Sequence, residues 1–476
     1  MKQLLNRLSE IEIDPKSPFD NDALGRQKYA EIFTTVVNSY SETGCVLAIN
    51  GKWGTGKTTF INMWRALLVQ SAYKTLYFNA WESDYMDDPL VALVSEVRGL
   101  NADDGKFKNV AANVGKIVLS AVSSTVVSVL KNKFGVDCDA INDTLKAAND
   151  VGEKCLDDYA EQKKTFKEFK GSLQSFIADN AGEKPVVFFI DELDRCRPDY
   201  SVKVLERIKH LFDLPNIIFV LSVNKKQLGH AIQGFYGTSS LDADDYLRRF
   251  IDLEYDLPKP NMEEFIKYLY NQHGFDDFLN NDERRQYFGR EDEPGEFRAT
   301  ATQFAELCHL DLRTLDRIFT ISRITLQEMN SNNYLLPDVL FVLCLMKIKY
   351  PDIYRGIVNK SYKVQELLNA IEMDILKDHL EKSKRHPYER RLEYTIGTLL
   401  FNYNNPYYDD IVDQTFVGKD TDKENQKEFP FTSTKLNHEK LNDAFNWCSN
   451  SHREKIRMGL KFSTDRIDLL NELKVN

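Results

Sequence analysis

The chain has 476 residues, of which 42% are hydrophobic and 28% charged, and this composition is ordinary for a globular protein of two or three domains. Its 62 basic and 73 acidic residues give a formal charge of -11, which argues against non-specific wrapping of nucleic acid. The N-terminal residues are too polar for a secretory signal, so we expect a cytoplasmic protein. The seven cysteines are scattered and form no C-x-x-C pair, so the sequence predicts neither a disulfide framework nor a zinc site.

The first apolar run, Cys45 to Asn50, predicts a buried strand, and residues 51 to 58 directly after it read Gly-Lys-Trp-Gly-Thr-Gly-Lys-Thr. This is the G-x-x-x-x-G-K-[ST] spacing of a phosphate-binding loop. In such a loop the glycines let backbone amides turn toward phosphate oxygens, Lys57 adds a positive charge, and Thr58 offers a hydroxyl to Mg²⁺. The helix predicted from Thr58 to Leu68 adds the attraction of its N-terminus for phosphate.

A second strand is predicted from Thr75 to Asn79, and the region from residue 101 to 180 is too long for one loop of a compact domain. It indicates an inserted helical subdomain. Within it, the apolar stretch from Ile117 to Leu130 is shorter than the about 20 residues of a membrane span and contains four serines and a threonine. We expect no transmembrane span, and we favour a helix packed on the domain or on another subunit over a membrane-surface segment.

The third predicted strand, Pro185 to Ile190, is apolar throughout and ends in Asp191 and Glu192. Nucleotide hydrolysis requires one carboxylate for Mg²⁺ and another to orient the attacking water, both at the end of a strand near the phosphate loop. We assign Asp191 to the metal and Glu192 to the water. By itself an apolar strand that ends in acids is a weak signal, but paired with the upstream loop it is a strong one.

A fourth strand is predicted from Ile217 to Val223, and Asn224 follows it. The polar residue at this point commonly senses the γ-phosphate or the water in P-loop enzymes that have an acidic pair. Asn224 is therefore a candidate sensor. It is equally well placed to cap the helix that follows, and the two roles are compatible.

A fifth strand is predicted from Phe250 to Tyr255, and helical stretches separate the five strands, which predicts a parallel α/β sheet with right-handed crossovers. Beyond residue 260 the pattern is helical. Amphipathic segments are predicted from Ala301 to Leu310 and from Leu312 to Met329, and a buried segment from Leu336 to Lys347.

These motifs together resemble the KAP family of P-loop NTPases, within the class that includes AAA+ and STAND proteins. The resemblance covers about residues 20 to 350. It rests on Asp22-Ala-Leu-Gly-Arg26, on the Gly-x-Trp-Gly-x-Gly-Lys-Thr form of the loop, on Phe78-Asn-Ala-Trp-Glu82, and on Ile190-Asp-Glu-Leu-Asp-Arg-Cys196. The family more often has aspartate where this chain has Glu192, a change that favours an active base.

The resemblance implies a P-loop core whose sheet order is 5-1-4-3-2. We accordingly expect the core at residues 1–100 and 181–260, the inserted helical subdomain at 101–180, a helical lid at 261–330, and an all-α C-terminal domain at 331–476. A lid of this kind contributes an arginine to the nucleotide. Arg313 is our first candidate and Arg317 the second, against the simpler interpretation of a solvated surface arginine.

The resemblance also implies an arginine just before the fifth strand that reaches the nucleotide of a neighbouring subunit. Arg249, or failing it Arg248, is the candidate, and a pair of surface arginines is an equally good interpretation. The remaining residues expected to contact nucleotide are those of the two upstream motifs, namely Gly25, Arg26, Gly51, Trp53, Gly54, Thr55, Gly56, Lys57, Thr58 and Thr59.

Two hypotheses follow. The first is a Mg²⁺-dependent ATPase that acts as a switch in a homo-oligomer, with a protein effector and, by resemblance, a role in exclusion of phage or other mobile elements. The second is a nucleotide-binding scaffold with little turnover. Intact Lys57, Thr58, Asp191 and Glu192 favour the first. The preference for ATP comes from the family, since the sequence has no Asn-Lys-x-Asp guanine motif.

Overall fold

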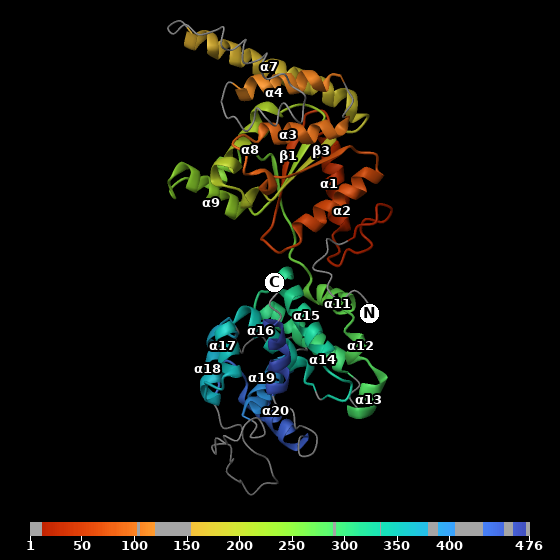
Figure 1. The fold of residues 1–476 in the computed structure, drawn as a ribbon, viewed down its shortest axis with the longest axis vertical. Coiled ribbons are helices and arrows are strands. Elements are labelled where there is room, and N and C mark those ends of the chain that lie inside the picture. The colour runs from red at the N-terminus through yellow and green to blue at the C-terminus, as the bar shows by residue number, and fades with distance from the viewer. Residues whose placement is uncertain are drawn as a thin grey trace. The chain divides into compact units, whose positions relative to one another are not determined.

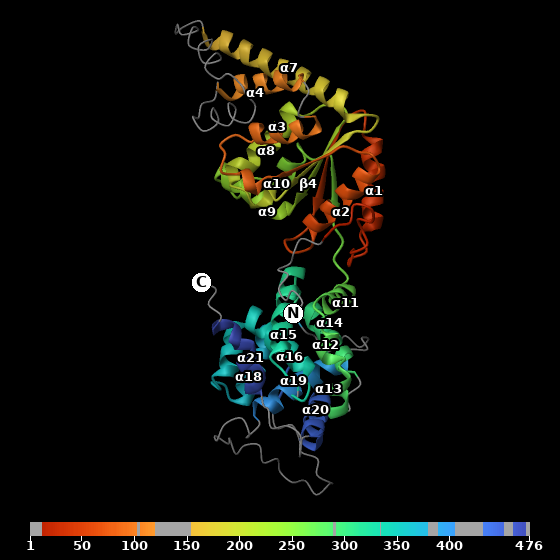
Figure 2. The same cartoon turned by 45° about the vertical axis from the view of Figure 1, so that its right-hand side comes forward.

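The computed structural model describes residues 12–101, 105–119, 154–288, 292–333, 335–378, 389–404, 432–451 and 460–472. The chain divides into two compact units, Met1–Lys259 and Pro260–Asn476 (Figure 1, Figure 2). In the described residues the strands belong to the first unit, and the second unit is helical.

Within the described residues, parallel strands form one sheet in the order β2-β3-β4-β1-β5, which confirms the predicted order 5-1-4-3-2. The strands are β1 (Cys45–Asn50), β2 (Thr75–Asn79), β3 (Val186–Asp191), β4 (Ile217–Val223) and β5 (Leu253–Asp256). The fold is thus the α/β core of a P-loop NTPase.

Helices cover both faces of this sheet, which explains the apolar runs of its central strands. Along β3, Val186, Phe188 and Ile190 face one hydrophobic cluster, and Val187 and Phe189 face the other. The second cluster is closed by α1 (Gln27–Ser39) and α2 (Lys57–Gln70). The first is closed by α3 (Leu90–Val97), α4 (Phe107–Leu119), α7 (Lys154–Ala181), α8 (Pro198–Leu211) and α9 (Lys225–Tyr236).

The inserted region contributes α4 and α7, which lie side by side against the α3 face of the sheet in both views (Figure 1, Figure 2). Asn113 of α4 donates a hydrogen bond to Ser172 of α7 at 3.3 Å, and Lys106 forms an ion pair with Asp179. Residues 102–104 and 120–153 are outside the described residues, and so is most of the apolar stretch 117–130. Among the helices that the structure describes, none combines the length and apolar character that a bilayer crossing requires.

The predicted boundaries of two strands, β3 and β5, were wrong. β5 begins at Leu253 and not at Phe250, because Phe250 ends a turn in which its amide binds the Leu247 carbonyl at 2.9 Å. That turn follows the short helix α10 (Ala243–Leu247). β3 runs one residue further than predicted, so that Asp191 itself pairs in the sheet.

The second unit packs around α16 (Pro337–Lys349), whose residues 337–346 are all buried, as the unbroken apolar run predicts. α14 (Glu293–Leu307) and α15 (Leu312–Gln327) pack against it. The division of this unit into a lid and a C-terminal domain at residue 330 stays a prediction. In the described residues, the other helices of the unit are α11 (Met262–Gln272), α12 (Asp276–Leu279), α13 (Asp282–Phe288), α17 (Pro351–Val358), α18 (Val364–Asp374), α19 (Glu389–Tyr403), α20 (His438–Ser451) and α21 (Leu460–Glu472).

The turn before β1 yields a stability prediction. Gly44 has φ of 74°, and a Cβ there would lie 2.6 Å from the Leu214 carbonyl oxygen, whereas Gly182 has φ of 79° and nothing within 4 Å. We expect Gly182→Ala to lower the free energy of unfolding by about 1 kcal/mol, from backbone strain alone. Gly44→Ala should cost about 1–3 kcal/mol more, because backbone must move. Urea unfolding of both variants measures the difference, and equal losses would contradict the clash.

Candidate functional site

The loop between β1 and α2 has the backbone that phosphate binding requires. Gly54 and Gly56 have φ of 74° and 79°, in the left-handed region that glycine adopts without strain. Gly56 is the N-cap of α2, so the exposed Thr58 and the half-buried Thr59 lie in the first turn of that helix. The Gly51 amide binds the Val223 carbonyl at 3.0 Å, which ties the start of the loop to β4. Thr55 closes the loop by donating to the Lys52 carbonyl at 2.8 Å.

Lys57 is the charged centre of this loop. Its ammonium donates to the carbonyl oxygens of Gly51 at 2.6 Å and Lys52 at 3.2 Å, and the residue is only 9% exposed. Burial lowers the pKa of Lys57, and the carboxylates of Asp194 and Asp191 oppose that shift. The acidic motif is therefore close enough to the loop lysine for their charges to interact.

Asp191 is the last residue of β3 and is 1% exposed. It lies opposite Asn79 of β2 and Ser222 of β4, at the carboxyl edge of the sheet. One carboxylate oxygen accepts from the Glu192 amide at 2.9 Å, and the other accepts from the Tyr77 hydroxyl at 3.4 Å. Burial, and next the Asp191 charge, raise the pKa of Tyr77, so this phenol stays a hydrogen-bond donor.

Glu192 has φ of 59°, a left-handed conformation that is uncommon for a residue with a Cβ. Burial raises the pKa of its carboxyl group, and Arg195, whose guanidinium lies 3.0 Å from Oε1, opposes the rise. A raised pKa suits a general base, provided that the group remains ionised at neutral pH.

Two tryptophans tie the phosphate loop and the β2 edge to the acidic motif. Trp53 of the loop donates its indole N–H to Asp194 at 2.5 Å, and Trp81, in the turn after β2, lies beneath the guanidinium of Arg195 at 5.5 Å. Both indoles are about half exposed, at 46% and 50%. Trp53 thus contacts the acidic motif, whatever its role toward nucleotide.

Arg26 is 3% exposed and reaches the phosphate loop from the residue before α1. Its guanidinium donates to the carbonyl oxygens of Gly56 at 3.1 Å and Pro258 at 3.4 Å. Burial lowers the pKa of Arg26 to about 10, and Asp22 opposes the shift. Gly25 precedes it with φ of 61°. The Arg26 side chain therefore stabilises the phosphate loop by a hydrogen bond to the backbone of that loop.

Asn224 caps α9, because its side chain accepts from the Gln227 amide at 3.4 Å. The half-buried side chain lies directly after β4, beside the ends of β1 and β3. Capping and phosphate sensing therefore remain compatible.

The KAP family P-loop domain matches residues 26–381, more than half of the chain. The chain belongs to the KAP family. One relative, the phage T7 exclusion protein of Escherichia coli (strain K12), is 23% identical over 237 residues. That alignment covers 46% of this chain and 31% of the relative, so it spans about a third of the relative's length.

Solved structures that align with this chain include the Aeropyrum pernix ORC2 protein in its ADP form, at 12% identity and a TM-score of 0.37, covering 82% of this chain and 88% of that chain. A DNA replication initiation factor matches at 10% identity and a TM-score of 0.27, covering 78% and 92%. Scores this low carry no argument about function, which has to come from the residues of this KAP chain.

The arginine candidates differ in their settings. Arg248 and Arg249 are exposed; Arg248 pairs with Asp245 at 3.1 Å, and Arg249 lies over Tyr246 at 5.9 Å. Asp252, three residues after Arg249, is hydrogen-bonded to Val46 near the start of β1. The phosphate loop follows the other end of β1, so the two arginines lie near the opposite edge of the sheet.

Arg313 and Arg317 are exposed on α15 of the second unit. Their proposed contact with nucleotide stays a prediction.

Sequence reasoning about the site missed Tyr77, Asn79, Asp194 and Arg195. Asn79, Asp194 and Arg195 lie in segments that resemble the KAP family, so the sequence contained these motifs, but no role was assigned to the three residues. Asn79 accepts from the Trp81 amide at 3.2 Å and donates to Glu82 at 2.9 Å, so it fixes the turn that carries Trp81.

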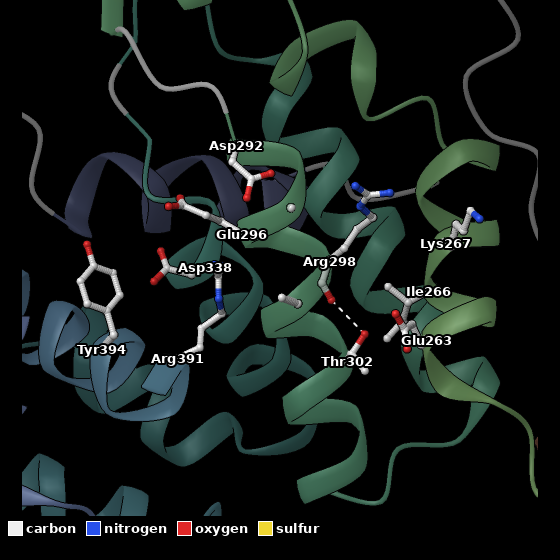
Figure 3. A pocket seen from close by; sticks show the side chains of 12 residues that line it. Glu263, Ile266, Lys267, Asp292, Glu296, Arg298, Thr302, Asp338, Arg391 and Tyr394 are labelled. Carbon is white, nitrogen blue, oxygen red and sulfur yellow. Dashed lines mark hydrogen bonds between the residues drawn. The ribbon is translucent and has the colours of Figure 1, made fainter. Parts of the chain in front are cut away.

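A separate cavity of about 780 Å³ lies within the second unit, between α11, α14, α16 and α19 (Figure 3). Figure 3 shows Asp338 and Arg391 directed toward one another, with Lys267 and Arg298 on the α11 side. Asp338 is 3% exposed and accepts from Thr395 at 3.1 Å. Charges of both signs line the cavity, so its composition selects no class of ligand.

The backbone of Glu192 can be tested directly. Glu192→Gly and Glu192→Ala both remove the ion pair with Arg195, but only glycine adopts positive φ freely. We expect the glycine variant to be more stable than the alanine variant by about 0.5–1 kcal/mol in urea unfolding. At Glu31, exposed in α1, the same two substitutions should give the opposite order, since alanine is the better helix former. The same order at both positions would contradict the strained backbone.

Proposed function

We propose that this KAP chain is a Mg²⁺-dependent ATPase whose hydrolysis switches a homo-oligomeric assembly between two states. The observation that carries the proposal is the placement of Lys57, Asp191 and Glu192 at one edge of the sheet, where the loop after β1 and the end of β3 lie on either side of β4. A turn that merely ended in acids would not bring a buried lysine and a buried carboxylate together, because both lose hydration.

Each group has a distinct task in this proposal. The loop amides and Lys57 bind the β- and γ-phosphates, and Thr58 and Asp191 are the oxygen donors that hold Mg²⁺. When bound, the metal neutralises charge on the phosphate oxygens. Glu192 orients a water and accepts its proton, and Asn224 contacts the γ-phosphate or that water while it caps α9.

The donor set fits the metal, because Mg²⁺ prefers oxygen ligands and usually takes only one or two of them from the protein. Asp191 is held in one orientation by the Glu192 amide and the Tyr77 hydroxyl. Arg313, Arg26 and the glycine-rich loop complete the proposed contacts to nucleotide, and the preference for ATP over GTP follows from family membership.

The alternative is a nucleotide-binding scaffold with little turnover. The contact between Glu192 and Arg195 favours it, because a carboxylate already engaged by a guanidinium is a weaker base. A measurement of ATP turnover distinguishes the ATPase from the scaffold.

The similarity to the phage T7 exclusion protein supports a role in defence against phage or other mobile elements. In this role a protein effector binds differently to the ATP-bound and ADP-bound states. This part of the proposal rests on resemblance alone, since fold does not determine function.

The first test separates binding from hydrolysis. Lys57→Ala should weaken ATP binding at least about tenfold, because the loop loses its buried charge. Glu192→Gln should retain binding while phosphate release falls about 10²–10⁴-fold, because an amide keeps the shape but takes no proton. Lys52→Ala is the control: this exposed lysine of the same loop should bind ATP within about twofold of the parent. Phosphate release at the parental rate by Glu192→Gln would remove Glu192 as the base.

The second test concerns assembly. Arg249 and Arg248 lie near the amino end of β5, away from their own phosphate loop, which supports contact with a neighbouring subunit. An Arg248/Arg249 double alanine variant should lose activity by several orders of magnitude, because the finger stabilises charge that develops in the transition state. Mixed with inactive Glu192→Gln subunits it should regain activity, since each mixed interface joins an intact Glu192 to an intact arginine.

Light scattering with and without a nonhydrolysable ATP analogue gives the accompanying subunit count. Full activity of the double variant alone would contradict the assignment of Arg248 or Arg249 as the arginine finger. A monomer in both conditions would contradict the proposed homo-oligomer.

A further inference from the structure

Ser222 of β4 carries a buried hydroxyl group that the packing of the sheet does not explain. The residue is 1% exposed, and in the part of the chain that the structure describes its Oγ has no hydrogen-bond partner. Such a hydroxyl destabilises the fold, because it gives up its hydrogen bonds to water and gains none in return. The other residues of β4 are all apolar, so an apolar side chain would suit this strand without that cost.

Side-chain alternation along β4 places Ser222 on the face of the sheet that α1 and α2 cover. Ile218 and Val220 belong to the hydrophobic cluster that these two helices close, whereas Leu221 and Val223 belong to the cluster on the other face. Successive side chains of a strand point to opposite faces. Ser222 therefore points to the same side as Ile218 and Val220.

Asp191 lies on this face as well, in the neighbouring position of β3. It follows Phe189, which belongs to the cluster of α1 and α2, and its carboxylate accepts from Tyr77, which packs against that cluster. The register of β3 and β4 pairs Asp191 directly with Ser222. Because the backbones of paired strands are about 5 Å apart, the hydroxyl lies beside the carboxylate that we propose as a metal ligand.

The residues on this face offer the oxygen atoms that Mg²⁺ prefers as ligands. Thr58 lies in the first turn of α2, the helix that packs on this face through Phe60 and Trp64. Mg²⁺ dehydrates reluctantly, so a bound ion keeps several waters, and the protons of these waters need acceptors. A serine hydroxyl has two acceptor lone pairs. Thr58, Asp191 and Ser222 together therefore fit a hydrated Mg²⁺ ion.

We propose that Ser222 is an outer contact of the metal site: its Oγ accepts a hydrogen bond from a water molecule of the bound Mg²⁺. This role rests on the Mg²⁺ and nucleotide binding proposed above, although it does not require turnover. Ser222 is a positioning residue, because it acts through the water and touches neither the ion nor the phosphates. The hydroxyl that destabilises the nucleotide-free chain gains its partner when metal and nucleotide are bound.

The test is Mg²⁺ binding to the full chain. Calorimetry follows Mg²⁺ as it is titrated into the stoichiometric complex of the chain with a nonhydrolysable ATP analogue. For Ser222→Ala we expect the Kd for Mg²⁺ to rise about tenfold, the effect of losing a contact outside the ligand shell. In EDTA the Kd for the analogue should stay within about twofold of the parent, because the contact exists only with metal.

Urea unfolding of the chain without metal and nucleotide supplies a second measurement. The Ser222→Ala midpoint should equal or exceed that of the parent, since the variant loses a hydroxyl that has no partner in the fold. Tyr200→Phe is the matched control. Tyr200 of α8 is 0% exposed, its hydroxyl is likewise unpartnered among the described residues, and it packs in the cluster on the other face. This variant should behave alike in urea and leave the Mg²⁺ affinity unchanged.

The outcomes are distinct. Unchanged Mg²⁺ affinity in Ser222→Ala overturns the role of Ser222 and leaves the proposed ATPase intact. A lower urea midpoint for Ser222→Ala, or an equal loss of Mg²⁺ affinity in Tyr200→Phe, also overturns that role, because the hydroxyl would then act through the fold. A parent complex that takes up no Mg²⁺ overturns the proposed metal site, and the role of Ser222 falls with it. A parent that binds Mg²⁺ and releases no phosphate overturns the ATPase alone.

Discussion

The alignment of strand ends on β4 is the constraint on which the site depends. β1 and β3 both pair with β4, and their last residues, Asn50 and Asp191, lie opposite Val223 and Ser222, adjacent positions of that strand. Because the strands are parallel, everything that follows them emerges at the same edge. The phosphate loop and the acidic motif, far apart in sequence, therefore meet without any long loop to carry one to the other.

Placing charged groups at this edge has an energetic cost that the local contacts reduce. Lys57, Asp191 and Arg26 are each less than a tenth exposed, and each loses hydration on folding. Lys57 and Arg26 donate hydrogen bonds to backbone carbonyls, and Asp191 accepts hydrogen bonds from an amide and a phenol. These bonds hold the side chains in fixed orientations, so the site is organised by the same interactions that make its burial tolerable.

The sequence predicted what depends on local pattern and motif spacing, and it missed what depends on contacts between distant segments. The buried runs located the strands to within a few residues, and the loop motif predicted a helix from Thr58, one residue after its observed start at Lys57. The sheet order came from family resemblance, since apolar runs do not specify neighbours. The bond from Trp53 to Asp194 joins residues 141 apart, and nothing in either segment indicates it. The predicted start of β5 was wrong because Phe250 lies in a turn, where its side chain packs into the hydrophobic core, and does not pair in the sheet.

Glu192 illustrates how one residue reconciles backbone and chemistry. Where the family more often has aspartate, this chain has glutamate in a left-handed conformation, which aspartate and asparagine tolerate better than longer residues do. The backbone cost, of order 1 kcal/mol, needs a compensating gain. The extra methylene supplies reach, because it carries the carboxylate to 3.0 Å from Arg195, which the stack on Trp81 already holds in place. A shorter side chain at this position would relieve the backbone and give up that contact, so the choice of glutamate and the presence of Arg195 explain one another.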